Sequence, residues 1–193
     1  MISTKSFNRD NIIRDSKKLP KGAYVCKIIS ARVDENQYGQ RLVISFDISE
    51  GEYAGYYKEK FDTSNAEDKK WSGVIRLGIP KDDGSEADQW RVRSFNTALV
   101  AIEDSNSGYL WDGDETKLKG KTVGVVFNLK EFEGNDGRVI SYTQPKALTS
   151  VKSVREGTYY VPKDEPLKTD HKASEDTSWM DVSDVSDDEL PFN

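Results

Sequence analysis

The sequence is poor in the residues on which most catalytic and metal sites depend. Its 193 residues include one cysteine, Cys26, and one histidine, His171. A single cysteine excludes an intrachain disulfide, and one Cys with one His cannot supply the ligands of a zinc site. His171 falls in a polar C-terminal segment, so no Ser-His or Cys-His pair is expected on a rigid scaffold. Because Cys26 lies within an apolar strand pattern, we expect it to be a buried core residue.

Nucleotide-binding loops and long apolar runs are also missing. No GxxxxGK[ST] or GxGxxG segment is present, and no apolar run approaches the roughly 18 to 20 residues of a membrane helix. The N-terminus, MISTKSFNRDNIIRDSKKLPKG, has no continuous apolar segment like that of a signal peptide. We therefore predict a cytoplasmic protein with no catalytic residues, no metal and no cofactor.

One acidic cluster, Asp112, Asp114 and Glu115, is the candidate for a divalent metal site of the kind that nucleases use. The simpler interpretation is a solvated acidic loop before a strand, which we favour. A nuclease stays open as the third-ranked function.

The net charge of −6 is unevenly distributed along the chain. Residues 169–193 contain eight acidic residues and one basic residue, so this segment carries a charge of −7. Residues 1–168 keep 27 Lys and Arg against 26 Asp and Glu, for a charge of +1. A nearly neutral body can still have a basic groove on one side, so the acidic total does not exclude a nucleic-acid ligand.

Alternating apolar and polar residues predict three strands in the first third of the chain. Residues 22–33 are rich in β-branched and aromatic side chains, and residues 41–49 alternate with apolar side chains on one face. Gly39 lies between these segments, so they are predicted to form a hairpin. The segment 56–62, YYKEKFD, also alternates and is predicted to be the third strand of a meander.

The period then changes to that of a helix before strands return. A helix is predicted over 87–103, with large apolar residues near helical spacing at Trp90, Phe95, Leu99 and Ile102. Trp90 is interpreted as a core residue of this helix, and 71–79 are ambiguous between helix and strand. Two more strands are predicted at 121–132 and 138–151, joined by the turn EGNDGR.

Five short strands with one helix between the third and fourth match the partly open Greek-key barrel called the OB fold. Other small barrels and sandwiches fit the strand count, and the position of the helix favours the OB fold. We predict a mainly β protein with an OB-fold domain and N-terminal extension over 1–166. Residues 167–193 are predicted to be a disordered acidic tail, because they have no sustained apolar period.

Aromatic and basic residues are interleaved where an OB fold binds oligonucleotides. Single strands are held by a groove that neutralises phosphates and by aromatic rings, each stacked base contributing roughly 1–3 kcal/mol. The predicted DNA-binding residues are Tyr38, Arg41, Tyr56, Tyr57, Lys58, Lys60, Arg138, Tyr142 and Lys146. The competing interpretation is half-buried packing for the tyrosines and protection of a sheet edge for the lysines. Arg76, Arg91 and Arg93 are interpreted as exposed charges in or near the helix. Trp71, Trp90 and Trp111 are further candidates for base stacking, although the helical spacing of Trp90 favours a core position.

The chain ends in SDDELPFN, an acidic run followed by apolar residues. A solubility tail would explain the acidic residues but not an exposed Leu-Pro-Phe. A partner protein with an apolar pocket rimmed by basic residues would bind both parts. The predicted partner-binding residues are Asp187, Asp188, Glu189, Leu190, Pro191 and Phe192.

Several segments resemble known protein families. DDELPF resembles the acidic C-terminal tip of bacterial single-stranded DNA-binding proteins, although here Asn193 follows the phenylalanine. PKGAYVCKIISARV, GEYAGYY, FNTALVAIEDSNSGYLWDGDETKLKGKTVGVVF and SVREGTYYVPKD resemble single-stranded DNA-binding proteins encoded by phages of low-GC Gram-positive bacteria. This second resemblance covers most of residues 20–165. It implies an OB fold, binding of single-stranded DNA in the host cytoplasm during phage replication, and recruitment of partners by the tail.

The predicted function is therefore a non-catalytic protein that coats and protects single-stranded DNA in phage replication or recombination. It would recruit replication or recombination proteins through its tip, and the sequence leaves its oligomeric state open. The alternative is a protein-binding adaptor, or an inhibitor that mimics DNA, with no DNA binding of its own. A basic stripe on the barrel would distinguish the two, because a mimic should lack one.

Overall fold

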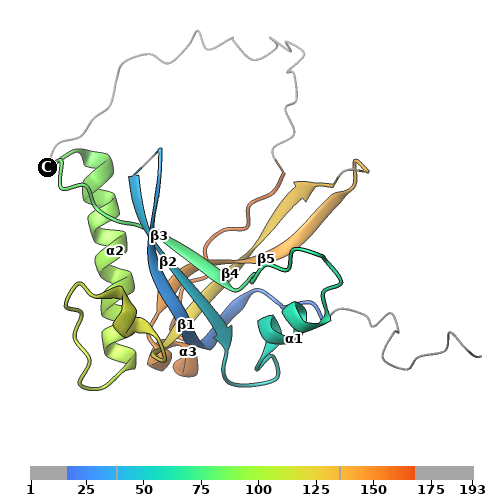
Figure 1. Ribbon diagram of the computed structural model, residues 1–193, viewed down its shortest axis with the longest axis horizontal. Coiled ribbons are helices and arrows are strands. Elements are labelled where there is room, and N and C mark those ends of the chain that lie inside the picture. The colour runs from blue at the N-terminus through green and yellow to red at the C-terminus, as the bar shows by residue number, and fades with distance from the viewer. Residues whose placement is uncertain (1–16, 38, 135, 168–193) are drawn as a thin grey trace, which may run out of the picture.

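The computed structural model describes residues 17–37, 39–134 and 136–167 (Figure 1). Its elements in chain order are β1 (Gly22–Asn36), β2 (Gly39–Ile48), α1 (Tyr56–Thr63), β3 (Val74–Gly78), α2 (Glu86–Ser105), the short 3-10 helix η1 (Glu115–Leu118), β4 (Thr122–Glu133), β5 (Val139–Thr149) and α3 (Val151–Glu156). The predicted tail lies outside the described residues from position 168 onward, and so do the six predicted tip residues.

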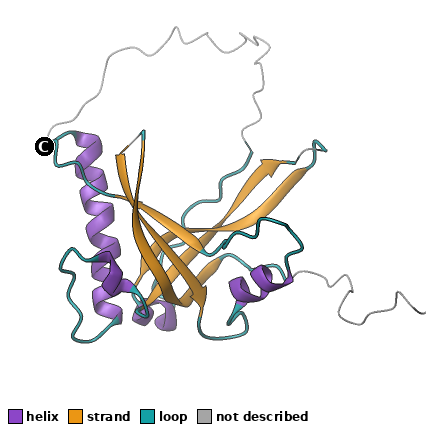
Figure 2. Cartoon of the chain, viewed as in Figure 1, coloured by secondary structure: helices purple, strands orange, loops and turns teal. Residues whose placement is uncertain are grey.

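The strands form one antiparallel sheet in the order β3-β2-β1-β4-β5 (Figure 2). β4 therefore returns beside β1 after the β1-β2-β3 meander, which is the Greek-key order. No ladder joins β3 to β5 within the described residues, so the sheet is not closed. The prediction of a mainly β protein is confirmed.

The core lies on the inner face of this sheet. The alternation of β2 predicted that one face would be apolar, and Leu42, Ile44, Phe46 and Ile48 are all buried there. From β4, the residues Val123, Val125 and Phe127 meet them in the same cluster. Cys26 is fully buried, as predicted.

The prediction of a third strand at 56–62 is wrong, because these residues form α1. Asp47, near the end of β2, accepts hydrogen bonds from the backbone N–H groups of Tyr57 and Lys58 at 2.9 and 3.2 Å. The third strand is instead β3, within the segment that the sequence left ambiguous. Gly73 precedes it, and a Cβ there would lie 2.3 Å from the Phe46 carbonyl oxygen. Only glycine allows the chain to pass this close to β2.

The helix predicted at 87–103 is present as α2, which contacts β3, β4 and β5. Ser85 caps it by accepting a hydrogen bond from the Asp88 N–H at 3.2 Å. The prediction that Trp90 is a core residue is wrong, since its side chain is 66% exposed. Among the described residues, no helix is long and apolar enough to span a membrane.

Candidate nucleic-acid interface

The face of β1, β2 and β3 that points away from the core carries four basic side chains, one of which, Arg41, is a predicted DNA-binding residue. We call it the outer face, and it consists of Lys27, Ser30, Arg32 and Asp34 on β1, Arg41, Val43, Ser45 and Asp47 on β2, and Val74, Arg76 and Gly78 on β3. Its residues stand in rows because the register pairs them across the strands. One row is Arg32, Val43 and Arg76, in which two exposed guanidinium groups flank a buried valine.

Positive charge on the outer face is largely unneutralised. Arg41 is paired with Asp34 at 2.9 Å, and this hydrogen bond lowers the pKa of the Asp34 carboxyl. Within 17–37, 39–134 and 136–167, Lys27, Arg32 and Arg76 form no ion pair. Three cations without a protein counterion on one face favour a ligand that carries phosphates.

A groove of about 510 Å³ lies where the free edges of β3 and β5 approach α2. It is lined by the five residues of β3, Trp90 and Ser94 of α2, and Tyr142, Gln144, Pro145 and Lys146 of β5. None of these is acidic. Trp90 and Tyr142 are 66% and 42% exposed, so their rings are open to a ligand beside the Arg76 guanidinium. This combination of rings and cations is the one that single-stranded nucleic acid requires.

The β4–β5 hairpin extends the aromatic surface beyond the groove. Phe132 pairs directly with Ile140, and Lys130 pairs directly with Tyr142. The rings of Phe132 and Tyr142 meet edge to face at 5.5 Å, and both are at least 40% exposed. In Figure 1 this hairpin and the β1–β2 hairpin both project toward the top of the view.

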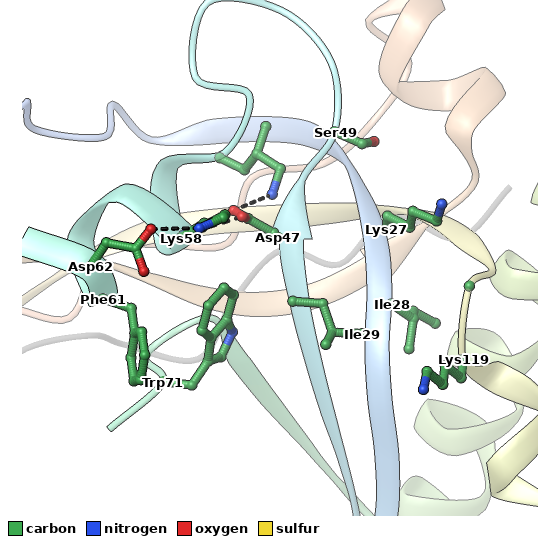
Figure 3. A pocket seen from close by; sticks show the side chains of 12 residues that line it. Lys27, Ile28, Ile29, Asp47, Ser49, Lys58, Phe61, Asp62, Trp71 and Lys119 are labelled. Atoms are coloured by element: carbon green, nitrogen blue, oxygen red, sulfur yellow. Dashed lines mark hydrogen bonds and ion pairs between the residues drawn. The ribbon is translucent and has the colours of Figure 1, made fainter. Parts of the chain in front are cut away.

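A second cavity, of about 780 Å³, lies beside α1 (Figure 3). Ile29, Phe61 and Trp71 supply large apolar side chains, and Lys27, Lys58 and Lys119 supply charge. The Trp71 indole N–H donates to the carbonyl oxygens of Phe46 and Gly73 at 3.0 and 3.2 Å, which fixes the orientation of the ring. The two cavities share no lining residue.

The candidates on 56–60 do not form the stacking strand that the sequence predicted. Tyr57 is 4% exposed and packs edge to face on Phe46 at 5.5 Å. Tyr56 is half-buried against Tyr53 and Tyr57. Lys58 and Lys60 are exposed on α1, where Lys58 pairs with Asp62 and lines the second cavity. The helix α1 turns the two tyrosines toward the protein, which makes Tyr57 unavailable to a base and leaves Tyr56 only partly exposed.

The remaining predicted DNA-binding residues lie in different parts of the structure. Tyr142 and Lys146 line the groove, and the Lys146 ammonium also pairs with Glu165. Arg41 belongs to the outer face, and Arg138 is exposed near the tip of the β4–β5 hairpin, paired with Asp136 at 3.1 Å. Tyr38 lies outside the described residues.

The acidic cluster has local roles. Asp112 pairs with Lys117, and this hydrogen bond lowers the pKa of its carboxyl. Asp114 caps η1, and its hydrogen bond with Thr116 lowers its pKa likewise. Across the described part of the chain, no group of three or more His, Cys, Asp and Glu side chains is placed to hold a metal ion.

Comparison with known proteins gives no identity. Neither the models of known protein families nor the curated protein sequences contain a match to this chain. The site is therefore interpreted from its own chemistry.

Sequence reasoning missed three cations of this surface: Lys27, Arg32 and Arg76. Arg76 was assigned to the neighbourhood of the helix because its segment was ambiguous, whereas it lies on β3 opposite Val43. A signal was present, because the apolar residues Ile75 and Leu77 alternate with Val74, Arg76 and Gly78, which places Arg76 on the face opposite Ile75 and Leu77. The three cations lie on one face because of the order and register of the strands. The sequence alone does not give that order or register.

Proposed function

We propose that this protein binds single-stranded DNA without catalysis, using the groove between β3, β5 and α2 and the outer face next to it. The groove carries the proposal, because it combines two exposed aromatic rings with Arg76 and has no acidic lining residue. Bases stack on Trp90 and Tyr142, and the strand's phosphates lie against Arg76 and Arg32.

The topology supports an OB-type barrel as the scaffold. A three-strand meander followed by a fourth strand beside the first, with a helix between β3 and β4, is the arrangement expected of that fold. OB folds bind oligonucleotides on the second and third strands and at the loops of the first and last hairpins. The groove and the β4–β5 hairpin occupy corresponding positions here.

The wider role is part of the same proposal. The resemblance of residues 20–165 to phage proteins favours coating and protection of single strands during phage replication or recombination in the host cytoplasm. The DDELPF segment, with three acidic residues before Leu-Pro-Phe, suits recruitment of a replication or recombination protein. The basic outer face favours this function over a DNA-mimicking inhibitor, which would present acidic groups in its place.

The test is fluorescence anisotropy with a labelled oligo-dT and a duplex of equal length, titrated at several salt concentrations. We expect preference for the single strand, and an affinity that falls with salt at a logarithmic slope of about −0.7 per phosphate contacted. Trp90→Ala should weaken binding by about 1–3 kcal/mol, the range for one stacked base. Arg76→Gln should weaken binding and make the salt slope shallower by about 0.7.

Lys152→Ala is the matched control. Lys152 is exposed on α3, pairs only with Glu156 among the described residues, and lines neither cavity. Its removal should leave the affinity unchanged to within about twofold, since an isolated surface charge contributes little. Failure of the wild-type protein to bind any single strand at low salt, repeated without residues 168–193, would refute the proposal.

A further inference from the structure

We propose that the second cavity, beside α1, is an additional base-binding subsite for the same DNA strand that occupies the groove. This inference rests on the proposed function. It assigns a ligand to a surface that lies outside the groove and shares none of its lining residues.

A bulge in β1 supplies one of the apolar side chains of the cavity, that of Ile29. β1 and β2 change register between Ile28 and Ser30, so Ile29 is an extra residue without a partner on β2. Such a bulge re-aims a side chain, and Ile29 is 40% exposed at the cavity instead of packing in the core. Figure 3 shows Phe61 and Trp71 next to each other, with Ile29 between these rings and Lys119.

The ring surface is held in a fixed position. Trp71 is anchored by its two hydrogen bonds to backbone carbonyl oxygens, and the Phe61 ring lies 5.8 Å from it at 45°. A ring that is already oriented loses little entropy when a base stacks on it, so the site is preorganised. An apolar surface of this kind binds any base, because every base has an aromatic face.

The charge of the cavity matches a phosphate backbone. Lys27 and Lys119 have no ion-pair partner in the part of the chain that the structure covers, whereas Lys58 is paired with Asp62 at 2.5 Å. The other acidic residue of the lining, Asp47, is engaged with the backbone N–H groups at the start of α1. Asp47 keeps its charge, so the lining has three lysines against two carboxylates and a net charge of +1, with the Lys27 and Lys119 ammonium groups on the side of β1 and η1.

The outer face connects this cavity to the groove. In the strand register Arg76 of the groove lies opposite Val43, and Lys27 of the cavity lies opposite Asp47, four residues further along β2. At about 3.3 Å per residue, the two rows are about 13 Å apart. The row between them holds Ser30, Ser45 and Val74, which are too small to block a strand lying along β2. Continuity with the groove is the reason to assign this cavity to DNA instead of to a peptide.

The experiment compares a Lys27→Ala/Lys119→Ala double variant with the wild-type full chain, by anisotropy, on oligo-dT ligands of about 4 to 20 nucleotides, a range that spans the site sizes of OB folds. Short ligands fill the groove alone and should bind both proteins equally. Long ligands reach the cavity, and we expect the variant to bind them roughly three- to tenfold more weakly, with a shallower salt slope. Lys152→Ala is again the control, because Lys152 is exposed on α3 and lines neither the cavity nor the groove.

Each other result overturns the inference. Equal binding of wild-type and double-variant proteins at every length, while Arg76→Gln still weakens binding, would remove the subsite and leave the proposed function intact. Absence of binding by the wild-type protein at any length would refute both. A loss in the double variant that disappears when residues 168–193 are deleted would assign the cavity to the acidic tail instead of to DNA.

Discussion

The Tyr24 phenol is half-buried against the core and donates a hydrogen bond to the Pro20 carbonyl oxygen at 2.9 Å. Burial raises its pKa to about 12, and burial also raises the pKa of Tyr57, which packs on Phe46. In the unfolded chain a tyrosine ionises near pH 10. The neutral phenol is thus favoured by folding, and this contribution to stability is complete below pH 10.

We therefore expect the free energy of unfolding to fall as the pH rises from about 10 to 12, because the unfolded state releases protons that the folded state keeps. Urea titrations at a series of pH values measure this. Tyr24→Phe should lower the stability at pH 8 and make the fall above pH 10 shallower. Tyr160→Phe is the control, since this side chain is 74% exposed and its removal should leave the fall unchanged. A stability that is flat to pH 12 would contradict the prediction.

Single residues also show why the site was only partly predictable. Trp90 lies five positions before Phe95, which places the two about 140° apart around a helix, so they cannot share one buried stripe. Asp88 takes the buried position near the start of α2, where its carboxylate accepts a hydrogen bond from the Lys81 N–H at 2.8 Å. Periodicity counted over only four apolar residues did not separate these faces. The exposed Trp90 is what makes the groove aromatic.

At the scale of elements, apolar content and alternation predicted β1, β2, β4 and β5 within a few residues of their bounds. The burial differs between them, since β4 is buried on both faces over 123–128 and β5 buries only Leu148. The segment 56–62 alternates equally well over seven residues but forms α1. The first backbone N–H groups of α1 donate hydrogen bonds to the Asp47 carboxylate on β2, and Tyr57 is the only buried side chain of α1. A tertiary contact decides this element, and no pattern within the segment contains that contact.

Because the Asp47 carboxylate accepts hydrogen bonds from the first backbone N–H groups of α1, we expect the stability of this helix to depend on Asp47. Asp47→Ala removes the acceptor for three backbone N–H groups, two of them at the start of α1 and the third that of Ile48. It should lower the free energy of unfolding by about 0.5–2 kcal/mol, the usual range for loss of a cap. Asp47→Asn keeps one acceptor oxygen and should lose less. Urea unfolding measures the stability change. Asp62→Ala, which breaks only the exposed pair with Lys58, is the control and should cost less than about 1 kcal/mol.

At the scale of the whole molecule, the last described residues, 165–167, lie beside β4. Glu165 forms a parallel bridge with Lys130, and the Leu167 N–H donates to the Glu131 carboxylate at 3.2 Å. From Glu165 to Leu167 the chain therefore runs along β4 in the direction of the β4–β5 hairpin tip. Leu167 is two positions before the segment with a charge of −7, and β4 belongs to the hairpin that extends the proposed DNA surface.

A tethered acidic segment competes with DNA for the same cations, because the tether gives it a high effective concentration. Deleting residues 169–193 should strengthen single-strand binding at low salt, by several-fold on the order expected for losing a weak intramolecular competitor. This gain in affinity should shrink as the salt concentration rises, because salt screens the interactions between exposed charges. A full-length variant with the eight acidic tail residues changed to Asn and Gln separates charge from chain length, and it should bind like the truncated protein. If both variants bind no more tightly than wild type at low salt, the tail does not compete for the cations of the outer face, and a role for it must come from partner proteins.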